Sequence, residues 1–75
     1  MQELARTTDM IKLSALRAAL ESAGVAAEIF DGAAGALLQA AIPLRLMVAD
    51  ADRRRADQAL RDAGFHRAAD NDWDL

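Results

Sequence analysis

Two short segments of this chain repeat each other at an offset of forty residues. ALESAGV occupies positions 19–25 and ALRDAGF occupies positions 59–65, and the same offset aligns Leu4 with Leu44. Each copy reads as the end of a helix, because a glycine just beyond the last apolar residue can adopt the left-handed conformation that terminates a helix. The repeat therefore predicts two halves built on one plan.

The first half reads as strand, helix, strand. QELART, residues 2–7, has the length of a short strand, and Thr8 or Asp9 can cap the N-terminus of a helix that ends at Gly24. VAAEIF, residues 25–30, alternates as a strand with two distinct faces. The helix carries apolar residues at helical spacing, and its predicted buried side consists of Leu13, Leu16, Leu20 and Ala23.

The second half follows the same order. LRLMVA, residues 44–49, is apolar on both faces, which is typical of a strand at the centre of a sheet. DADRRRADQALRDAG, residues 50–64, predicts a helix stopped by Gly64, and FHRAA, residues 65–69, predicts a weak last strand. The predicted inner side of this helix consists of Ala56, Ala59, Leu60 and Ala63.

Two strand–helix–strand units with right-handed crossovers predict an α+β fold. The specific expectation is a ferredoxin-like βαββαβ sandwich, with a four-stranded antiparallel sheet and two helices on one face. In this topology the first and third strands are central and the fourth lies at an edge. We expect a single domain over residues 1–68 and a flexible acidic tail over 69–75, in which Trp73 is either flanked by solvent or folded back over the sheet.

Three consecutive arginines, residues 53–55, favour a structural role. Consecutive helix positions lie about 100° apart, so the three side chains point in different directions. Acids four residues away offer ion pairs of about 0.2–0.5 kcal/mol each. A docking surface for an acidic partner is the main alternative, and a metal site on Asp50, Asp52 and Asp57 lacks a loop with further oxygen ligands. The expected ion pairs are Asp50–Arg54, Arg53–Asp57 and Asp57–Arg61.

Composition excludes several classes of function. The net charge of −3 and the isoelectric point of about 4.9 disfavour nucleic-acid binding. The sequence has no cysteine, which excludes disulfides and thiolate metal sites and fits a cytoplasmic location. The first ten residues lack the pattern of a signal peptide, and the longest uncharged run, residues 32–44, is too short to span a bilayer. We therefore expect no membrane and no nucleic-acid partner.

No catalytic constellation is visible in the sequence. His66 is the single histidine, and neither Ser14 nor Ser22 has a base at a suitable spacing. We therefore predict a protein that is not an enzyme and that carries no cofactor and no metal.

Two surfaces are candidates for binding. The connection over residues 32–44 is long, apolar and uncharged, so it forms either a short helical turn over a sheet edge, which we favour, or a docking segment that pivots on its glycines. The sheet face away from the helices, where we expect Ala5, should be solvated, paired with another copy or covered by the tail. The candidate binding residues are Phe30, Asp31, Gly32, Gly35, Leu37, Leu38, Ile42, Arg45 and Met47.

Two long segments, ELARTTDMIKLSALRAALESAGVAAEIFD and IPLRLMVADADRRRADQALRDAGF, resemble a known family. The most specific parts are RTTD at residues 6–9, the Ala-Gly pair before the second strand, and PLRLMVAD at residues 43–50. The family is described as putative prokaryotic signal-transducing proteins, which are small bacterial proteins of unknown function compared with PII regulators. The resemblance implies a ferredoxin-like fold and a regulatory role, with partner contacts in the loop that corresponds to residues 31–43. It transfers no catalytic residues and does not imply ATP binding.

These observations predict a non-enzymatic regulatory or signal-transducing module that docks through the loop between the second and third strands. Its partner is a protein or a small ligand, and the small size of the chain favours a homo-oligomer. The alternatives are a small-molecule-sensing domain and a small dimeric ferredoxin-like enzyme. RNA binding is less favoured, because the two predicted central strands contain no aromatic residue on which a base could stack.

Overall fold

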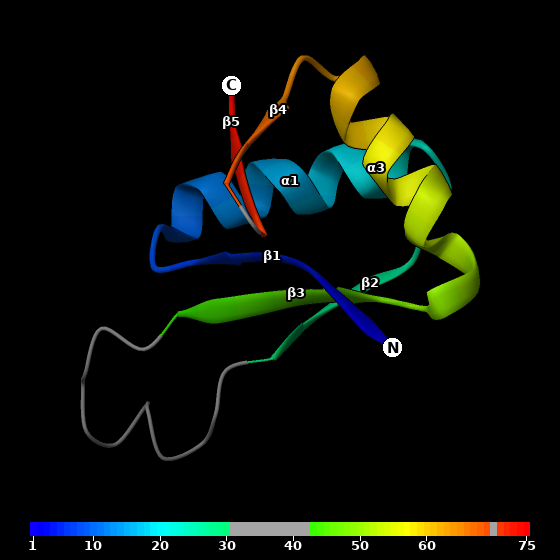
Figure 1. Cartoon of the computed structure of the whole chain (residues 1–75), viewed down its shortest axis with the longest axis horizontal. Helices are drawn as coiled ribbons and strands as arrows, with labels where there is room; N and C mark the ends of the chain where they lie inside the picture. The colour runs from blue at the N-terminus through cyan, green and yellow to red at the C-terminus, as the bar shows by residue number, and fades with distance from the viewer. Residues whose placement is uncertain (31–42, 70) are drawn as a thin grey trace.

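The computed structural model describes residues 1–30, 43–69 and 71–75, and Figure 1 shows their arrangement. This part of the chain contains two α-helices, one short 3-10 turn and five strands. In chain order they are β1 (Gln2–Thr7), α1 (Met10–Ser22), β2 (Ala27–Phe30), β3 (Leu44–Val48), the turn η1 (Asp50–Asp52), α3 (Arg53–Asp62), β4 (His66–Ala69) and β5 (Asp72–Asp74).

The main sheet is antiparallel and has the strand order β1-β3-β2. β3 lies at its centre, as its apolar residues on both faces predict. Both helices lie on the same side of this sheet, and α1 also packs against α3 (Figure 1). The α+β class and the placement of both helices on one face are therefore confirmed.

The prediction of a single four-stranded sheet is wrong for the described residues. β4 pairs only with β5, in a separate two-stranded antiparallel sheet. All four residues of β4 are exposed, so this strand has no apolar face to bury against the helices. The outer edge of β1, where a fourth strand would lie, is taken by the C-terminal residues: the Arg6 N–H donates to the Asn71 carbonyl at 2.7 Å, and the Trp73 indole donates to the Leu4 carbonyl at 3.1 Å.

The C-terminal residues 69–75 were expected to form a flexible tail. Their described part instead contains β5, and Trp73 is fully buried. Of the two arrangements considered for Trp73, the structure shows the one in which the ring folds back onto the protein. Burial of an indole outweighs the acidic character of its neighbours, because a large aromatic side chain contributes one of the largest apolar areas available to a small core.

Helix α1 begins and ends where the sequence predicts. The Asp9 carboxylate accepts from the N–H groups of Ile11 and Lys12 at 2.9 and 3.2 Å, so Asp9 is the N-cap. Gly24 has a φ of 77°, which stops the helix. The predicted buried residues Leu13, Leu16 and Leu20 are all buried, whereas Ala23 is exposed because it lies beyond the last helical turn.

The two repeated segments close their helices by the same hydrogen bonds. The Val25 N–H donates to the Leu20 carbonyl at 2.9 Å, and the Phe65 N–H donates to the Leu60 carbonyl at 2.9 Å. Gly64 has a φ of 97° and stops α3 as Gly24 stops α1. In α3 the predicted inner residues Ala56, Ala59 and Leu60 are buried, and Ala63, the residue after the helix, is exposed.

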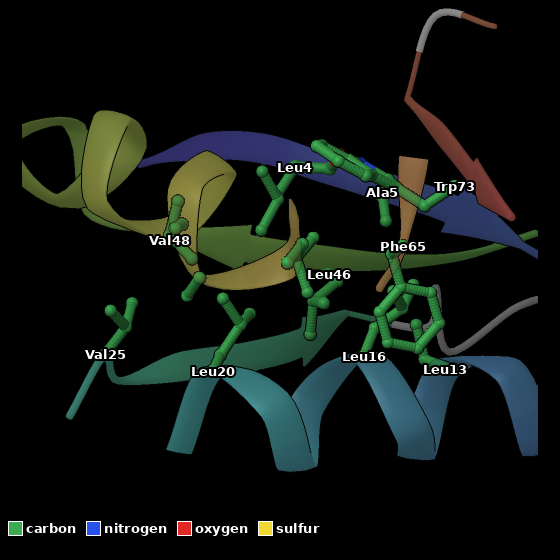
Figure 2. Close-up of a cluster of buried hydrophobic side chains, with 13 residues drawn as sticks. Leu4, Ala5, Leu13, Leu16, Leu20, Val25, Leu46, Val48, Phe65 and Trp73 are labelled. Atoms are coloured by element: carbon green, nitrogen blue, oxygen red, sulfur yellow. The ribbon is translucent and has the colours of Figure 1, made fainter. Parts of the chain in front are cut away.

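A β-bulge in β1 overturns the expected position of Ala5. We expected Ala5 on the helix-free face, yet it is buried beside Leu4. The register of β1 against β3 shifts between Glu3 and Ala5, so two consecutive residues oppose Leu46 and both face the helices. Figure 2 shows these side chains pointing toward α1, and the buried core consists of Leu4, Ala5, Leu13, Leu16, Leu20, Val25, Leu46, Val48, Ala56, Ala59, Leu60, Phe65 and Trp73.

In the described residues, neither helix combines the length and the apolar character needed to cross a membrane.

Candidate functional site

The helix-free face of the main sheet brings three of the predicted binding residues together. Arg45 lies directly opposite Phe30 across β3 and β2, and Met47 lies opposite Glu28. Directly opposite residues in an antiparallel pair share one face, so these four side chains form one surface, which we call the open-face patch. Phe30 is 38% exposed, Arg45 is exposed and Met47 is half-buried. The patch therefore offers apolar surface beside a cation.

Strand β1 adds two charges to this face. Arg6 lies opposite Arg45, and Glu3 lies opposite Met47. Two like charges directly opposite each other repel, and the ion pair between Arg6 and Glu3, at 2.9 Å, offsets that repulsion at Arg6. Arg45 makes no ion pair with any residue in ranges 1–30, 43–69 and 71–75. Its charge, like that of the exposed Glu28, is therefore available to an incoming group.

The other predicted binding residues lie outside the described residues. They belong to the segment 31–42, so the choice between a helical turn and a docking segment stays open. The residues concerned are Asp31, Gly32, Gly35, Leu37, Leu38 and Ile42.

Two of the three arginines, Arg53 and Arg55, have the structural role that the sequence favours. Arg53 donates to the backbone carbonyl of Glu3 at 2.7 Å and so fastens α3 to the edge of β1. Arg55 donates to the carbonyl of Ala23 at 3.4 Å, at the negative end of the α1 dipole. Arg54 is exposed and has no ion pair among the described residues. The three side chains therefore diverge and form no single basic patch.

The ion pairs around α3 agree only in part with the spacing rule. Arg53 pairs with Asp57 at 3.4 Å, as predicted. Asp50 lies in the 3-10 turn and pairs instead with the amino group of Met1 at 3.3 Å. The second partner of Asp57 is Arg67 of β4 at 3.8 Å, in place of the arginine four residues along α3. In the described part of the chain, no group of three His, Cys, Asp or Glu residues could hold a metal ion.

Sequence reasoning missed the surface that receives the C-terminal residues. Lys12 of α1 lies between the carboxylates of Asp72 and Asp74, at 3.3 and 3.0 Å. The hydrogen bond to Asp74 raises the pKa of Lys12, and burial opposes this increase only in part. Lys12 is the only lysine of the chain, and the acidic segment that it contacts also holds the only tryptophan. The opposite charges of Lys12 and these aspartates are the only sequence signal that fits the contact.

A second polar connection ties the same segment to α3. The Arg67 guanidinium lies over the Trp73 ring, 5.5 Å from its centroid, and reaches Asp57. The Oδ1 atom of Asp57 is buried without a hydrogen-bond partner among the described residues. Asp57 therefore lies between Arg53, which also bonds to the edge of β1, and Arg67, which also lies over the Trp73 ring.

A shallow groove of about 300 Å³ runs between the C-terminal halves of α1 and α3. Its walls are mostly alanine, and it has no convergent set of polar groups of the kind that orients a small ligand. His66, Ser14 and Ser22 are exposed. The residues lining the groove are Ala19, Ser22, Ala23, Ala59, Asp62 and Ala63.

The fold and the open-face patch define a small α+β domain in which α1 and α3 cover one sheet face and no other helix of the described residues covers the second face. The sequence model of the family described as putative prokaryotic signal transducing protein matches residues 1–64, and the chain belongs to this family. The predicted family membership is therefore confirmed. Residues 65–75, which include β4, β5 and Trp73, lie beyond the match. Comparison with curated proteins and with solved structures gave no match.

Proposed function

We propose that this protein is a non-enzymatic signal-transducing module of the cytoplasm that docks onto protein through the open-face patch, and that its first partner is a second copy of itself. The carrying observation is the exposure of Phe30 beside Arg45 on a sheet face that no helix of residues 1–30, 43–69 and 71–75 covers. Aromatic residues, methionine and arginine are the residue types enriched where proteins meet. The family description supports a signalling role.

The charges on the uncovered face suit pairing with a second copy. The side chains of this face form two rows across the sheet: a basic row with two arginines and an acidic row with two glutamates, and each row also holds one apolar residue. A two-fold axis between the rows brings the basic row of one copy over the acidic row of the other, which makes the face self-complementary. The basic row consists of Arg6, Arg45 and Phe30, and the acidic row consists of Glu3, Met47 and Glu28.

Sedimentation velocity on matched variants tests self-association. Phe30→Ser removes the exposed ring of the patch, and Arg45→Glu reverses the charge beside it. Ile11→Ser is the control, because Ile11 is also an exposed apolar residue, 83% exposed, but lies on α1. We expect both patch variants to weaken the association constant at least tenfold, with unchanged circular dichroism, and the control to behave as the wild type. A wild type that stays monomeric at high concentration would contradict self-pairing.

Photo-crosslinking in the source cell tests docking on other proteins. A benzoylphenylalanine at position 30 should give discrete adducts, including one of twice the mass of the chain, and the same group at position 11 should not. Equal labelling from both positions would contradict a specific patch. A melting screen with nucleotides and common metabolites separates this proposal from a small-molecule sensor, which a ligand would stabilise.

The proposal includes the connection over residues 31–43, which leaves β2 after Phe30 and rejoins the sheet at Leu44. Replacement of Leu37 and Leu38 by serine should reduce the crosslinked adducts and leave the circular dichroism unchanged. If the double variant unfolds, these leucines are core residues and this part of the proposal is wrong.

A further inference from the structure

Two hydrogen bonds join the outer edge of β1 to residues 71–73, although β5 pairs with β4 and not with the main sheet. The Arg6 N–H donates to the carbonyl of Asn71 at 2.7 Å, and the Leu4 carbonyl accepts from the indole of Trp73 at 3.1 Å. In strand addition, such bonds to the main chain supply affinity, while pockets for alternate side chains supply selectivity. The edge of β1 therefore contacts the C-terminal segment through one backbone bond and one side-chain bond.

The side chains around this edge select a particular kind of segment. The Trp73 ring is fully buried and lies beside Leu4 and Ala5 in Figure 2. Lys12 holds the acidic residues on either side of the tryptophan, at 3.3 and 3.0 Å. Glu3 accepts from the side-chain amide of Asn71 at 2.5 Å. We call the receptor residues Glu3, Leu4, Arg6 and Lys12 the tryptophan seat.

The segment and its seat differ in their relation to the family match. All four seat residues lie within residues 1–64, which the family shares, whereas the bound segment lies beyond the family match. The segment belongs to a two-stranded sheet of its own, and such a hairpin has little stability by itself. Every residue of β4 is exposed, so the hairpin is held through Phe65 and Trp73, the polar contacts of the seat and the ion pair between Arg67 and Asp57.

We propose that the tryptophan seat is a peptide-binding site for extended acidic segments that carry a tryptophan, and that residues 71–75 of the chain fill it in cis. When the chain's own segment leaves, Leu4 and neighbouring core residues meet water, so the empty seat favours any segment that covers them again. A peptide in trans must compete with a resident segment whose effective concentration is of millimolar order. The site is therefore occupied in trans only by partners that are abundant, tethered to the protein or bound to it at a second place.

Fluorine NMR on the full chain tests this proposal with a synthetic peptide. The probe is the pentapeptide of residues 71–75, NDWDL, with 5-fluorotryptophan at its third position. The receptor is the Trp73→Ala variant, whose own segment no longer fills the seat. We expect saturable binding with a shifted and broadened fluorine signal. Binding to the wild type should be at least tenfold weaker, because the resident segment competes.

Charge reversal at Lys12 makes the test specific. The variant Lys12→Glu/Trp73→Ala should bind the pentapeptide at least tenfold more weakly than Trp73→Ala. A peptide in which both aspartates are replaced by lysine should instead bind Lys12→Glu/Trp73→Ala more tightly than Trp73→Ala. Binding that ignores both changes would show nonspecific adsorption to exposed core residues and would overturn the proposal.

A second receptor guards against unfolding of the first. In Asp72→Lys/Asp74→Lys the chain keeps Trp73, but its own segment is repelled by Lys12. This variant should bind the pentapeptide more tightly than the wild type does and should keep the circular dichroism of the fold. If every folded receptor fails to bind the pentapeptide more tightly than the wild type, the seat serves only its own chain and the proposal is wrong.

Discussion

The indole N–H of Trp73 donates a 3.1 Å hydrogen bond to the backbone carbonyl of Leu4, 69 positions earlier in the chain. This bond satisfies an acceptor on the outer edge of β1 that no strand of the main sheet reaches. The ring that makes the bond is fully buried, and so is Leu4. Trp73 near the C-terminus and Leu4 in the first strand therefore belong to the same buried core.

Replacement of Trp73 should destabilise the fold strongly. Trp73→Ala leaves a cavity at the edge of the core and an unpaired carbonyl at Leu4, and we expect a loss of about 3–5 kcal/mol in the free energy of unfolding. Trp73→Phe keeps most of the ring but not the donor, and we expect a loss of about 1–3 kcal/mol. Urea denaturation followed by circular dichroism measures both. His66→Ala is the control at an exposed position, and a loss there as large as for Trp73→Ala would contradict the assignment.

The contact between Lys12 and the C-terminal carboxylates should make the stability of the fold decrease at alkaline pH. The pKa of Lys12 is raised in the folded state, so its contribution to stability is complete below the unfolded pKa of 10.5 and is lost as the pH rises through the folded pKa. The chain has no tyrosine, no cysteine and no other lysine, so no other side chain titrates between pH 9 and 12. Melting temperatures of the wild type and Lys12→Met over this range measure the effect. The wild type should lose stability across the range, and Lys12→Met should not.

Two adjacent arginines should differ sharply in their effect on stability. Arg53→Met removes the 2.7 Å hydrogen bond to the Glu3 carbonyl and the ion pair with Asp57, and we expect a loss of about 1–3 kcal/mol. Arg54→Met changes an exposed side chain and should stay within about 0.5 kcal/mol of the wild type. Urea midpoints of the two variants measure the difference. Equal losses would mean that the arginines act through general charge and not through contacts.

The start of α1 gives a second matched comparison. Asp9→Ala removes the acceptor of two backbone N–H groups and should cost about 0.5–2 kcal/mol. Thr8→Ala removes a side chain with no cap bond in the described structure and should have little effect. Thermal melts distinguish the two, and a larger loss at Thr8 would place the cap one residue earlier.

Much of the helical layer could be predicted, because the sequence signals of a helix lie within the helix and at its ends. Two such signals are confirmed: the spacing of Leu13, Leu16 and Leu20, and the glycine that follows the C-terminus of each helix. The pair Arg53–Asp57 follows from spacing alone and is also confirmed. These features depend only on neighbours within about one turn of the chain.

The errors arose where contacts between distant residues decide the structure. The bulge that turns Ala5 inward has no mark in QELART, because it depends on the register against β3. The pairing of β4 with β5 depends on where Trp73 is buried, and with acidic residues on both sides of it the sequence left both an exposed and a folded-back ring open. The open-face residues Phe30, Arg45 and Met47 were placed together correctly, since alternation along two confirmed strands was sufficient.

The fluorescence of Trp73 tests the central claim most directly, because it is the only tryptophan and the chain has no tyrosine. If the C-terminal segment is docked on β1, the wild type should emit at short wavelength and resist quenching by acrylamide, and both properties should vanish together when urea unfolds the sheet. Emission and quenching like those of the pentapeptide NDWDL in water, from a chain whose circular dichroism is native, would contradict the docking of this segment.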